Sequence, residues 1–344
     1  MTSPSEVRKH VEMPLNNPVT RHGDAMPPEG AGGLFSEGWY PICASSELGV
    51  GQIRGEDFLD GRVVVYRGDD GVARVMSAYC PHVGADLSVG RVAGDSIQCA
   101  FHKWEFDGQG ACTKTAIGDP APAWARLFKF PVMERYGVVW AHNGDELTWD
   151  LPDWEFPDDE LEFRVFRYAP MACDPWVACA NTPDMQHIKT VHGAMFSGED
   201  PHEEVRWDKW GFRYSLQAHD QVGVPIDWEV GIRGTTLFQQ QGLYGDFWLG
   251  AMAGIGLPRP GQCTVFSIQV LRRPEGPDAA HVLEERFERA EYLMRRTIDD
   301  EDLAILNTIH YRPGALTKAD TTLGRYLSFV RKFPRSHASA AFIR

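Results

Sequence analysis

Two short stretches, CPH at residues 80–82 and CAFH at residues 99–102, carry most of the structural information in this sequence. Each stretch contains one cysteine and one histidine, and each lies in a turn that follows a strand-like segment. Two loops of this kind could face each other across a β-sandwich and bring two thiolates and two imidazoles together. Such a set of donors suits either tetrahedral zinc or an iron–sulfur cluster.

The distribution of the donors discriminates between these metals. A zinc finger usually pairs its cysteines with each other and its histidines with each other, whereas each loop here supplies one of each. This arrangement matches a Rieske [2Fe–2S] centre, in which Cys80 and Cys99 hold one iron while His82 and His102 hold the other. Two neutral imidazoles in place of thiolates raise the reduction potential. The alternatives are a zinc site and unrelated core cysteines with histidines nearby.

Outside these loops, length and composition limit the class of protein. The chain has 344 residues, 43% of them hydrophobic, and a formal net charge of −14. This length suggests two domains, and the acidic balance argues against nucleic acid or an anionic membrane as the main partner. We find neither the roughly eighteen consecutive apolar residues of a membrane helix nor an apolar secretory signal. Seven cysteines are too sparse for a disulfide framework, so we expect a cytoplasmic protein.

Turn residues and periodicity divide the chain into three parts. Residues 1–33 are rich in proline and glycine and predict a disordered extension. Short strand-like segments separated by Gly/Asp turns, such as RVVVYR at 62–67, predict an all-β domain over residues 34–150. Residues 151–344 combine strands with helices, among them a long helix over 277–310. The fold class that we expect is therefore α+β, with an antiparallel sheet and flanking helices in the C-terminal domain.

A second group of metal-ligating residues lies in the stretch NTPDMQHIKTVH, from Asn181 to His192. Two histidines and one carboxylate on one face of Fe(II) leave adjacent positions open for dioxygen and for water or substrate. His187 and His192 are five residues apart, so a straight α-helix would point them in different directions. They converge only if the turn widens in a π-like way or if His192 lies past the helix end, which Gly193 permits. The alternative is a structural or surface pair of histidines.

Residues 34–150 resemble the Rieske domain of the Rieske non-haem iron oxygenases. Ala85 and Phe101 stand where respiratory Rieske proteins carry two extra cysteines, which fits the lower-potential oxygenase type. Two departures are Ala100 and Lys103, which stand where the family often has proline and glycine. We expect them to affect the tuning or docking of the cluster rather than its presence. Beyond the four ligands, the resemblance includes Trp39, Tyr40, Gly84, Gly90, Trp104, Tyr136 and Gly137.

The resemblance also implies roles for residues of the second group. It makes His187 and His192 ligands of a mononuclear iron. It assigns Asp184 to a bridge between an iron-ligating histidine and a cluster-ligating histidine of the neighbouring subunit. The alternative is an acid favoured at a helix N-terminus, and both roles can hold together. The carboxylate ligand is expected in the acidic run near residue 300, where Asp302 fits the spacing of the family and Asp299 is the second choice. Such a run is otherwise a solvated face.

The activity implied by the resemblance is that of the oxygenase (α) component of an α-only system. Such an enzyme activates O₂ at a mononuclear Fe(II) supplied by the Rieske cluster, and acts as a monooxygenase or dioxygenase that hydroxylates, dealkylates or desaturates. No G-x-G-x-x-G motif follows a predicted strand, so electrons would come from a separate NAD(P)H-dependent reductase or a ferredoxin. Electron transfer between neighbouring subunits implies a head-to-tail ring, a homotrimer.

The expected substrate is small and hydrophobic. Residues 205–257 are rich in aromatic side chains, and the tail after Asp302 weakly resembles the 3-ketosteroid 9α-hydroxylase and cholesterol 7-desaturase branch, which favours a steroid-like or polycyclic compound. Two other classes of protein remain open. An electron-transfer or redox-sensing protein with a vestigial second site would hold about two irons per chain instead of about three. A zinc-binding scaffold would be colourless.

Overall fold

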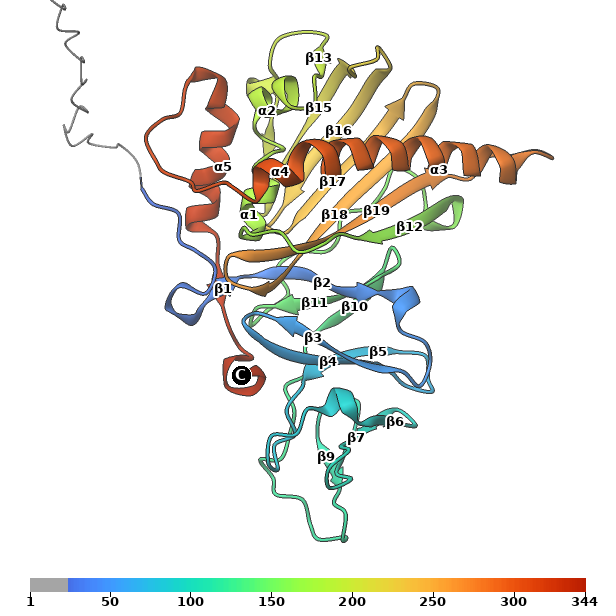
Figure 1. Cartoon of the computed structure of the whole chain (residues 1–344), viewed down its shortest axis with the longest axis vertical. Coiled ribbons are helices and arrows are strands. Elements are labelled where there is room, and N and C mark those ends of the chain that lie inside the picture. Colours follow the sequence, from blue (N-terminus) through green and yellow to red (C-terminus); the bar gives the residue numbers. More distant parts are fainter. Residues whose placement is uncertain (1–23) are drawn as a thin grey trace, which may run out of the picture.

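The computed structural model describes residues 24–344, which form two parts stacked along the long axis of the molecule (Figure 1). The lower part in this view holds the N-terminal strands, and the upper part holds a large sheet with helices against it. Residues 1–23 of the predicted disordered extension lie outside the described range. Residues 24–33 differ from that prediction, because they contain a short 3₁₀ helix, Ala31–Gly33, and the side chain of Glu29 is only 2% exposed.

The N-terminal part consists of three small antiparallel sheets, as the Gly/Asp turns predict. The first has the order β10–β11–β2, the second β3–β4–β5 and the third β6–β7–β8–β9. Their bounds are β2 Gly38–Ala44, β3 Ile53–Phe58, β4 Gly61–Arg67, β5 Ala73–Ser77, β6 Arg91–Ala93, β7 Ser96–Gln98, β8 Glu105–Phe106, β9 Cys112–Lys114, β10 Val132–Arg135 and β11 Val138–Asn143.

Strand β4 shows why this part needs a continuous apolar run. Its side chains alternate between two faces, as in every strand, and both faces are covered. Val63 and Val65 pack into one hydrophobic cluster, whereas Val64 and Tyr66 pack into another. The second cluster also contains Cys80 and Cys99, so the two cysteine–histidine loops stand on a packed core.

The C-terminal part is built on an antiparallel sheet of eight strands with the order β12–β19–β18–β17–β16–β15–β13, in which β14 pairs with β15. Inward apolar residues alternate with outward polar ones along β15 and β16, which is the pattern of a sheet with one buried face. The strands are β12 Leu161–Arg167, β13 Met195–Phe196, β14 Arg206–Trp207, β15 Gly211–His219, β16 Pro225–Arg233, β17 Leu237–Tyr244, β18 Phe247–Arg259 and β19 Gln262–Arg272.

Helices cover one face of this sheet, as the sequence predicts. The longest, α3 (Ala279–Arg295), crosses the sheet in Figure 1 and buries Phe287 and Ala290. It continues as a π-helix over Arg296–Asp302 and then as α4 (Leu303–Leu306), so the helix predicted over 277–310 contains a widened turn. The remaining helices are α1 Pro175–Cys179, α2 Met185–Thr190, α5 Thr321–Lys332 and α6 Ala340–Ile343.

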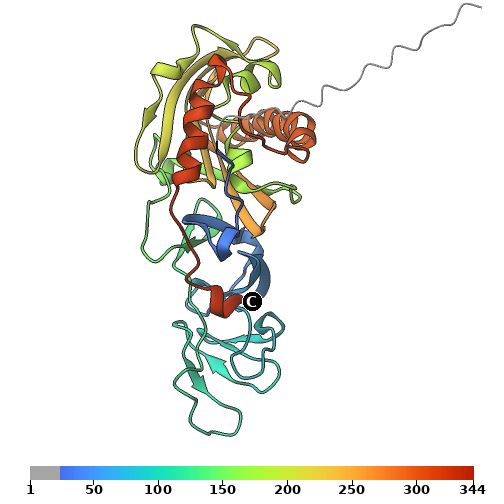
Figure 2. The ribbon, with the colours of Figure 1, turned by 90° about the vertical axis from the view of Figure 1, so that its left-hand side faces the viewer.

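The C-terminal tail returns to the N-terminal part, which the predicted boundary at residue 150 does not include. Strand β20 (Arg335–Ser336) pairs with β1 (Phe35–Ser36), and Ile343 of α6 is fully buried in the core formed by the N-terminal strands. Figure 2 shows the tail descending from α5 to these strands. No helix within residues 24–344 is both long and apolar enough to cross a membrane.

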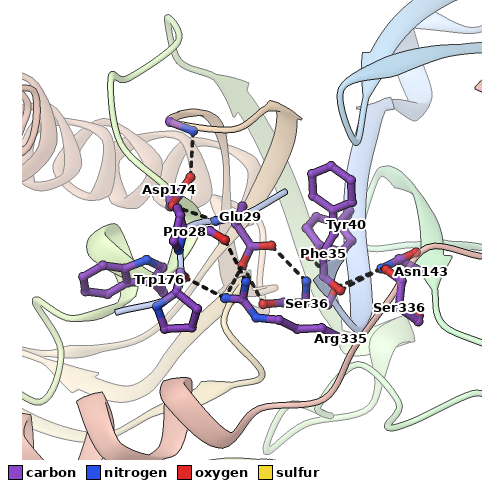
Figure 3. A network of polar contacts seen from close by, with 12 residues as sticks. Pro28, Glu29, Phe35, Ser36, Tyr40, Asn143, Asp174, Trp176, Arg335 and Ser336 are labelled. Carbon is purple, nitrogen blue, oxygen red and sulfur yellow. Dashed lines mark hydrogen bonds and ion pairs between the residues drawn. The ribbon is translucent and has the colours of Figure 1, made fainter. Parts of the chain in front are cut away.

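A buried polar network fastens this junction (Figure 3). The carboxylate of Glu29 accepts hydrogen bonds from the hydroxyl of Ser36 at 2.6 Å and from its backbone N–H at 2.9 Å. Arg335 lies 3.5 Å from the same carboxylate. The backbone N–H of Glu29 donates in turn to Asp174, the residue before α1, at 3.0 Å. Buried charges require such partners, so the network ties both ends of the described chain to the C-terminal sheet domain.

Candidate metal centres

The first cysteine–histidine loop follows β5 and is closed by two backbone hydrogen bonds. The N–H of Cys80 donates to the carbonyl of Ala85 at 2.9 Å, and the N–H of Gly84 donates to the carbonyl of Cys80 at 2.8 Å. Gly84 has a φ of +81°, a left-handed conformation that glycine adopts without strain. Cys80 is buried while His82 is exposed, so the loop directs a thiol toward the core and an imidazole toward the surface.

The second loop, after β7, closes in the same way. The N–H of Cys99 donates to the carbonyl of Trp104 at 2.8 Å, and the N–H of Lys103 donates to the carbonyl of Cys99 at 3.1 Å. Lys103 therefore occupies the position that Gly84 has in the first loop, and its φ is +58°. Its ammonium group donates to the carbonyl of Ala100 at 2.8 Å. The two residues that depart from the family pattern thus contact each other within one loop.

The two loops bring their histidines together. Nδ1 of His82 lies 3.1 Å from Nδ1 of His102, and the His82 ring stacks on Trp104 with ring centroids 4.4 Å apart. Burial raises the pKa of the Cys80 thiol to about 12, although the backbone N–H of His82 counteracts this shift. A thiol with a raised pKa keeps its proton until a metal ion binds the sulfur and displaces that proton. Two buried thiols behind two facing imidazole nitrogens fit the donors of a Rieske [2Fe–2S] cluster.

The second group of ligands begins at helix α2. His187 lies on the helix, whereas His192 follows its last residue, Thr190, and Gly193 has a φ of +61°. Of the two predicted routes to convergence, the structure has the second, in which His192 lies past the helix end. Nε2 of His187 and Nε2 of His192 are 2.9 Å apart.

Asp302 completes this set from the end of the π-helix. Its Oδ1 lies 3.2 Å from Nε2 of His187 and 3.5 Å from Nε2 of His192. This oxygen is buried and forms no hydrogen bond with any residue of the described range. Asp299, the second choice from the sequence, is exposed. One carboxylate oxygen and two imidazole nitrogens, all within 4.8 Å of one another, form a donor set that suits a non-haem Fe(II).

Glu301 contacts His192 at the ring nitrogen that is not part of the donor set, a contact that the sequence did not predict. Its Oε2 lies 2.7 Å from Nδ1 of His192, and its Oε1 accepts a hydrogen bond from Gln221 at 3.0 Å. Gln221 also donates to the backbone carbonyl of His192 at 2.9 Å. A carboxylate that accepts the Nδ1 proton leaves the Nε2 lone pair for a metal. The one sequence signal was the acid directly before Asp302.

Asp184 lies at the start of α2, where its carboxylate accepts the backbone N–H of His187 at 2.9 Å. It is therefore an N-cap residue, as one of its two predicted roles requires. Contacts with another subunit lie outside a single chain, so its predicted bridging role remains a prediction.

An apolar cavity of about 200 Å³ opens beside His187, His192 and Asp302. The sheet supplies one wall and the end of α3 with the π-helix supplies the other. Of the aromatic residues noted in the sequence, Trp228 and Phe238 line this cavity, whereas Trp248 packs against Trp154 and Trp207 against Phe212. Further lining residues are Met171, Leu216, Ile226, Val230, Gln240, Ala253, Ile255, Val265, Leu293 and Leu306.

The two candidate centres lie in opposite parts of the molecule along its long axis. In Figure 1 the loops beside β6 and β7 are at the lower end of the long axis, while α2 and the π-helix are in the upper part. Figure 2 shows the same separation after a quarter turn. Neither view brings the cluster loops of one chain near its own histidine–aspartate site.

Comparison with known proteins identifies a Rieske domain in the N-terminal part of the chain. Residues 38–130 match the family model of the Rieske [2Fe–2S] domain. The chain is 38% identical to the cholesterol 7-desaturase of Bombyx mori over 180 residues, 51% of this chain and 38% of the relative. It is 33% identical to the oxygenase component of dicamba O-demethylase from Stenotrophomonas maltophilia over 160 residues, 45% of this chain and 47% of the relative. The matches thus span less than half of each relative.

Solved structures extend the likeness to the whole fold. Dicamba monooxygenase bound to dicamba superimposes with a TM-score of 0.68 at 20% identity, over 86% of this chain and 96% of that one. NdmA of Pseudomonas putida CBB5 with caffeine gives a TM-score of 0.68 at 20% identity, over 86% and 89%. The predicted α+β fold class and the predicted resemblance to the Rieske oxygenases are confirmed.

Proposed function

We propose that this chain, which carries a Rieske [2Fe–2S] domain, is the terminal oxygenase of a multicomponent enzyme that acts on a hydrophobic substrate. The observation that carries this proposal is the convergence of His187, His192 and Asp302 beside an apolar cavity. A domain that only transferred electrons would need neither the second donor set nor the cavity.

The donors present fit both metal groups. Cys80 and Cys99 would hold one iron of the cluster and His82 and His102 the other, while His187, His192 and Asp302 would hold the mononuclear iron. With both groups bound, the chemistry supplied at the cavity is the reductive activation of O₂ next to the substrate.

The protein itself orients the donors and keeps water from the substrate. Glu301 accepts the Nδ1 proton of His192 and so fixes its tautomer. The apolar walls hold the substrate by burial of its surface and exclude bulk solvent from the reacting groups. Hydroxylation, dealkylation and desaturation all remain compatible with this site. The names of the curated relatives, a cholesterol desaturase and an O-demethylase, support a steroid-like or aromatic substrate.

The separation of the two centres supports electron transfer between subunits. We infer a head-to-tail homotrimer in which the cluster of one chain lies against the mononuclear site of the next, with Asp184 as the bridge. Exposed apolar side chains at both ends support such contacts: Val83 is 58% and Phe101 62% exposed beside the cluster ligands, and Met195 is 57% exposed just after α2. Electrons would reach the cluster from a separate reductase or ferredoxin.

Metal analysis combined with a substrate screen tests this function. The purified protein should contain about three irons per chain. Steroids and methoxylated aromatic compounds would be screened for substrate-dependent O₂ uptake with a suitable reductase, and products would be identified by mass. Asp299→Ala changes an exposed acid near the site. It is the control for substitution of Asp302 and should behave like the parent. About two irons per chain and no O₂ uptake with any compound would instead identify an electron carrier.

A further inference from the structure

Three consecutive glutamines, Gln239 to Gln241, lie in strand β17, and they differ in what their side chains contact. Gln239 donates to the backbone carbonyl of Asp153 at 3.1 Å, and Gln241 accepts the backbone N–H of Glu155 at 2.7 Å. Both therefore fasten the segment between the two domains to the outer face of the sheet. Because side chains alternate along a strand, Gln240 points to the opposite face.

Gln240 is buried in the cavity without a partner. It is 9% exposed, it lines the cavity beside the mononuclear site, and its amide forms no hydrogen bond with any residue from 24 to 344. Its neighbours along the same wall are apolar: Val230 is opposite it on β16, and Phe238 precedes it on β17. The amide faces the open cavity, so an apolar ligand that filled the cavity without a hydrogen-bonding group would leave it unpaired, at a cost on the order of 1–3 kcal/mol. A ligand that supplied the missing hydrogen bond would remove this cost.

Two further polar side chains of the cavity, Asp220 and Thr297, have partners, whereas the indole N–H of Trp228 and Nε of Arg296 form no hydrogen bond with any residue of the described range. Asp220 accepts the hydroxyl of Tyr244 at 2.8 Å and the backbone N–H groups of Val222 and Val224, both at 2.9 Å. Burial alone would raise the pKa of Asp220, but these donors hold it below its ordinary value. The hydroxyl of Thr297 donates to the carbonyl of Leu293 at 2.9 Å.

The charges of the cavity are also matched without a ligand. Arg296 lies 3.8 Å from Glu301 and acts on Asp220 as well, so one guanidinium faces two carboxylates. Asp302 faces the two histidines of the donor set. An anionic ligand would add negative charge to a pocket whose one lining arginine already has carboxylate partners. Before iron binds at His187, His192 and Asp302, these charges favour a neutral ligand, and ligand binding is compared in that state.

We propose that Gln240 is a specificity-determining residue, which binds a neutral carbonyl or hydroxyl oxygen of an otherwise apolar substrate. The amide can donate to a carbonyl and can both donate to and accept from a hydroxyl. The proposal rests on the proposed function, since it places the substrate in the cavity beside the mononuclear site. It adds that a polar anchor on the sheet wall orients the apolar body of the substrate.

Paired ligands that differ by one carbonyl group test this inference. Dissociation constants would be measured by calorimetry for cyclohexanone and cyclohexane, adamantanone and adamantane, and androstanone and androstane, so that three sizes are covered. The parent protein should prefer the ketone by at least about tenfold in the size that fits, because the hydrocarbon leaves the amide unpaired. Adamantanecarboxylate, which represents an anionic ligand, should bind more weakly than the ketone.

Gln240→Leu should reduce the ketone preference to a ratio near one and bind the hydrocarbon at least as well as the parent does. Gln239→Leu, on the outer face of the same strand, is the matched control and should keep the preference. Gln240→Met serves as a second variant if Gln240→Leu fails to fold, as thermal unfolding would show.

Three results would overturn the inference: no ketone preference in any size, a preference that persists in the Gln240 variants, or tighter binding of the carboxylate. The iron content of each sample separates this result from the proposed function. If the protein held only about two irons per chain, the proposed function would fail, but a ketone preference that Gln240→Leu removes would still support the role of Gln240. Normal turnover with an unchanged preference would leave the oxygenase intact and refute the role of Gln240.

Discussion

The two candidate metal centres differ in how the chain assembles them. The four proposed cluster donors lie between Cys80 and His102, in two loops. Each loop is closed by its own pair of backbone hydrogen bonds, and the two pairs are equivalent. The mononuclear donors come from a helix end and from a π-helix more than a hundred residues later in the chain, and side chains such as Glu301 hold them in place. Local backbone geometry suffices for the first centre, whereas the second depends on tertiary packing.

Removal of a proposed ligand of the mononuclear iron should have the largest effect, because it should abolish one centre and leave the other intact. In Asp302→Ala we expect iron to fall from about three to about two per chain, because two imidazoles alone hold Fe(II) weakly while the cluster loops are untouched. Turnover should fall to background, and the visible absorption of the cluster should persist. Iron analysis and absorption spectroscopy on the same sample measure both. Loss of the cluster absorption would contradict the independence of the two centres.

Asp184 tests the predicted connection between the centres. Asp184→Asn preserves an N-cap, since asparagine caps helices about as well as aspartate, but removes the negative charge. We expect all iron to remain and turnover to fall about a hundredfold, as for other groups that orient a ligating histidine. Single-turnover kinetics would locate the loss in oxidation of the cluster.

Asp184→Ala is the companion variant. It should show the same kinetic loss together with about 1 kcal/mol of destabilisation from the missing cap. Normal cluster oxidation in Asp184→Asn would show that Asp184 acts only as a helix cap.

Substitution of Glu301 tests whether its contact with Nδ1 of His192 matters for metal binding at the mononuclear site. Glu301→Gln keeps the size of the side chain but weakens acceptance of the His192 Nδ1 proton, so we expect about a tenfold loss of Fe(II) affinity. Equilibrium titration of Fe(II) into the apo site measures this affinity without turnover. Asp300→Asn, an exposed acid in the same π-helix, is the control and should change nothing. Equal affinities in both variants would show that Glu301 does not orient the histidine.

This contrast also explains what the sequence could predict. The proposed cluster ligands could be predicted from their spacing, because their positions depend on short loops. The location of His192 beyond its helix was one of two predicted options, since Gly193 allows the chain to leave the helix there. Asp302 needed the resemblance to a family, because nothing near residue 302 indicates which acid of the run turns inward.

Other features depend on long-range packing that no local pattern encodes. The burial of Ile343 in the N-terminal core is one example. A single apolar residue near a chain end has no periodic pattern from which its contacts could be predicted. The direction of Gln240 is another. Its place in a row of three glutamines shows that one differs in direction from the other two, but only the register of β17 shows which face borders the cavity.

The smallest expected effect concerns a difference between the two cluster loops themselves. Lys103 has a left-handed backbone at the position where the first loop has Gly84, and a side chain in this conformation is strained by roughly 1 kcal/mol. Lys103→Gly should relieve this strain. It also loses the hydrogen bond to Ala100 and gives the unfolded chain more freedom, so we expect a net stabilisation below about 1 kcal/mol.

Gly84→Ala is the matched test in the first loop. An added methyl group would meet no atom within 4 Å, so its expected cost of about 1 kcal/mol comes from the backbone alone. Denaturant unfolding of both variants, followed through the cluster absorption, gives the two free energies. Opposite signs would show that the loops share one backbone requirement that only the first meets with glycine. A destabilised Lys103→Gly would mean that the contact between Lys103 and Ala100 outweighs the strain.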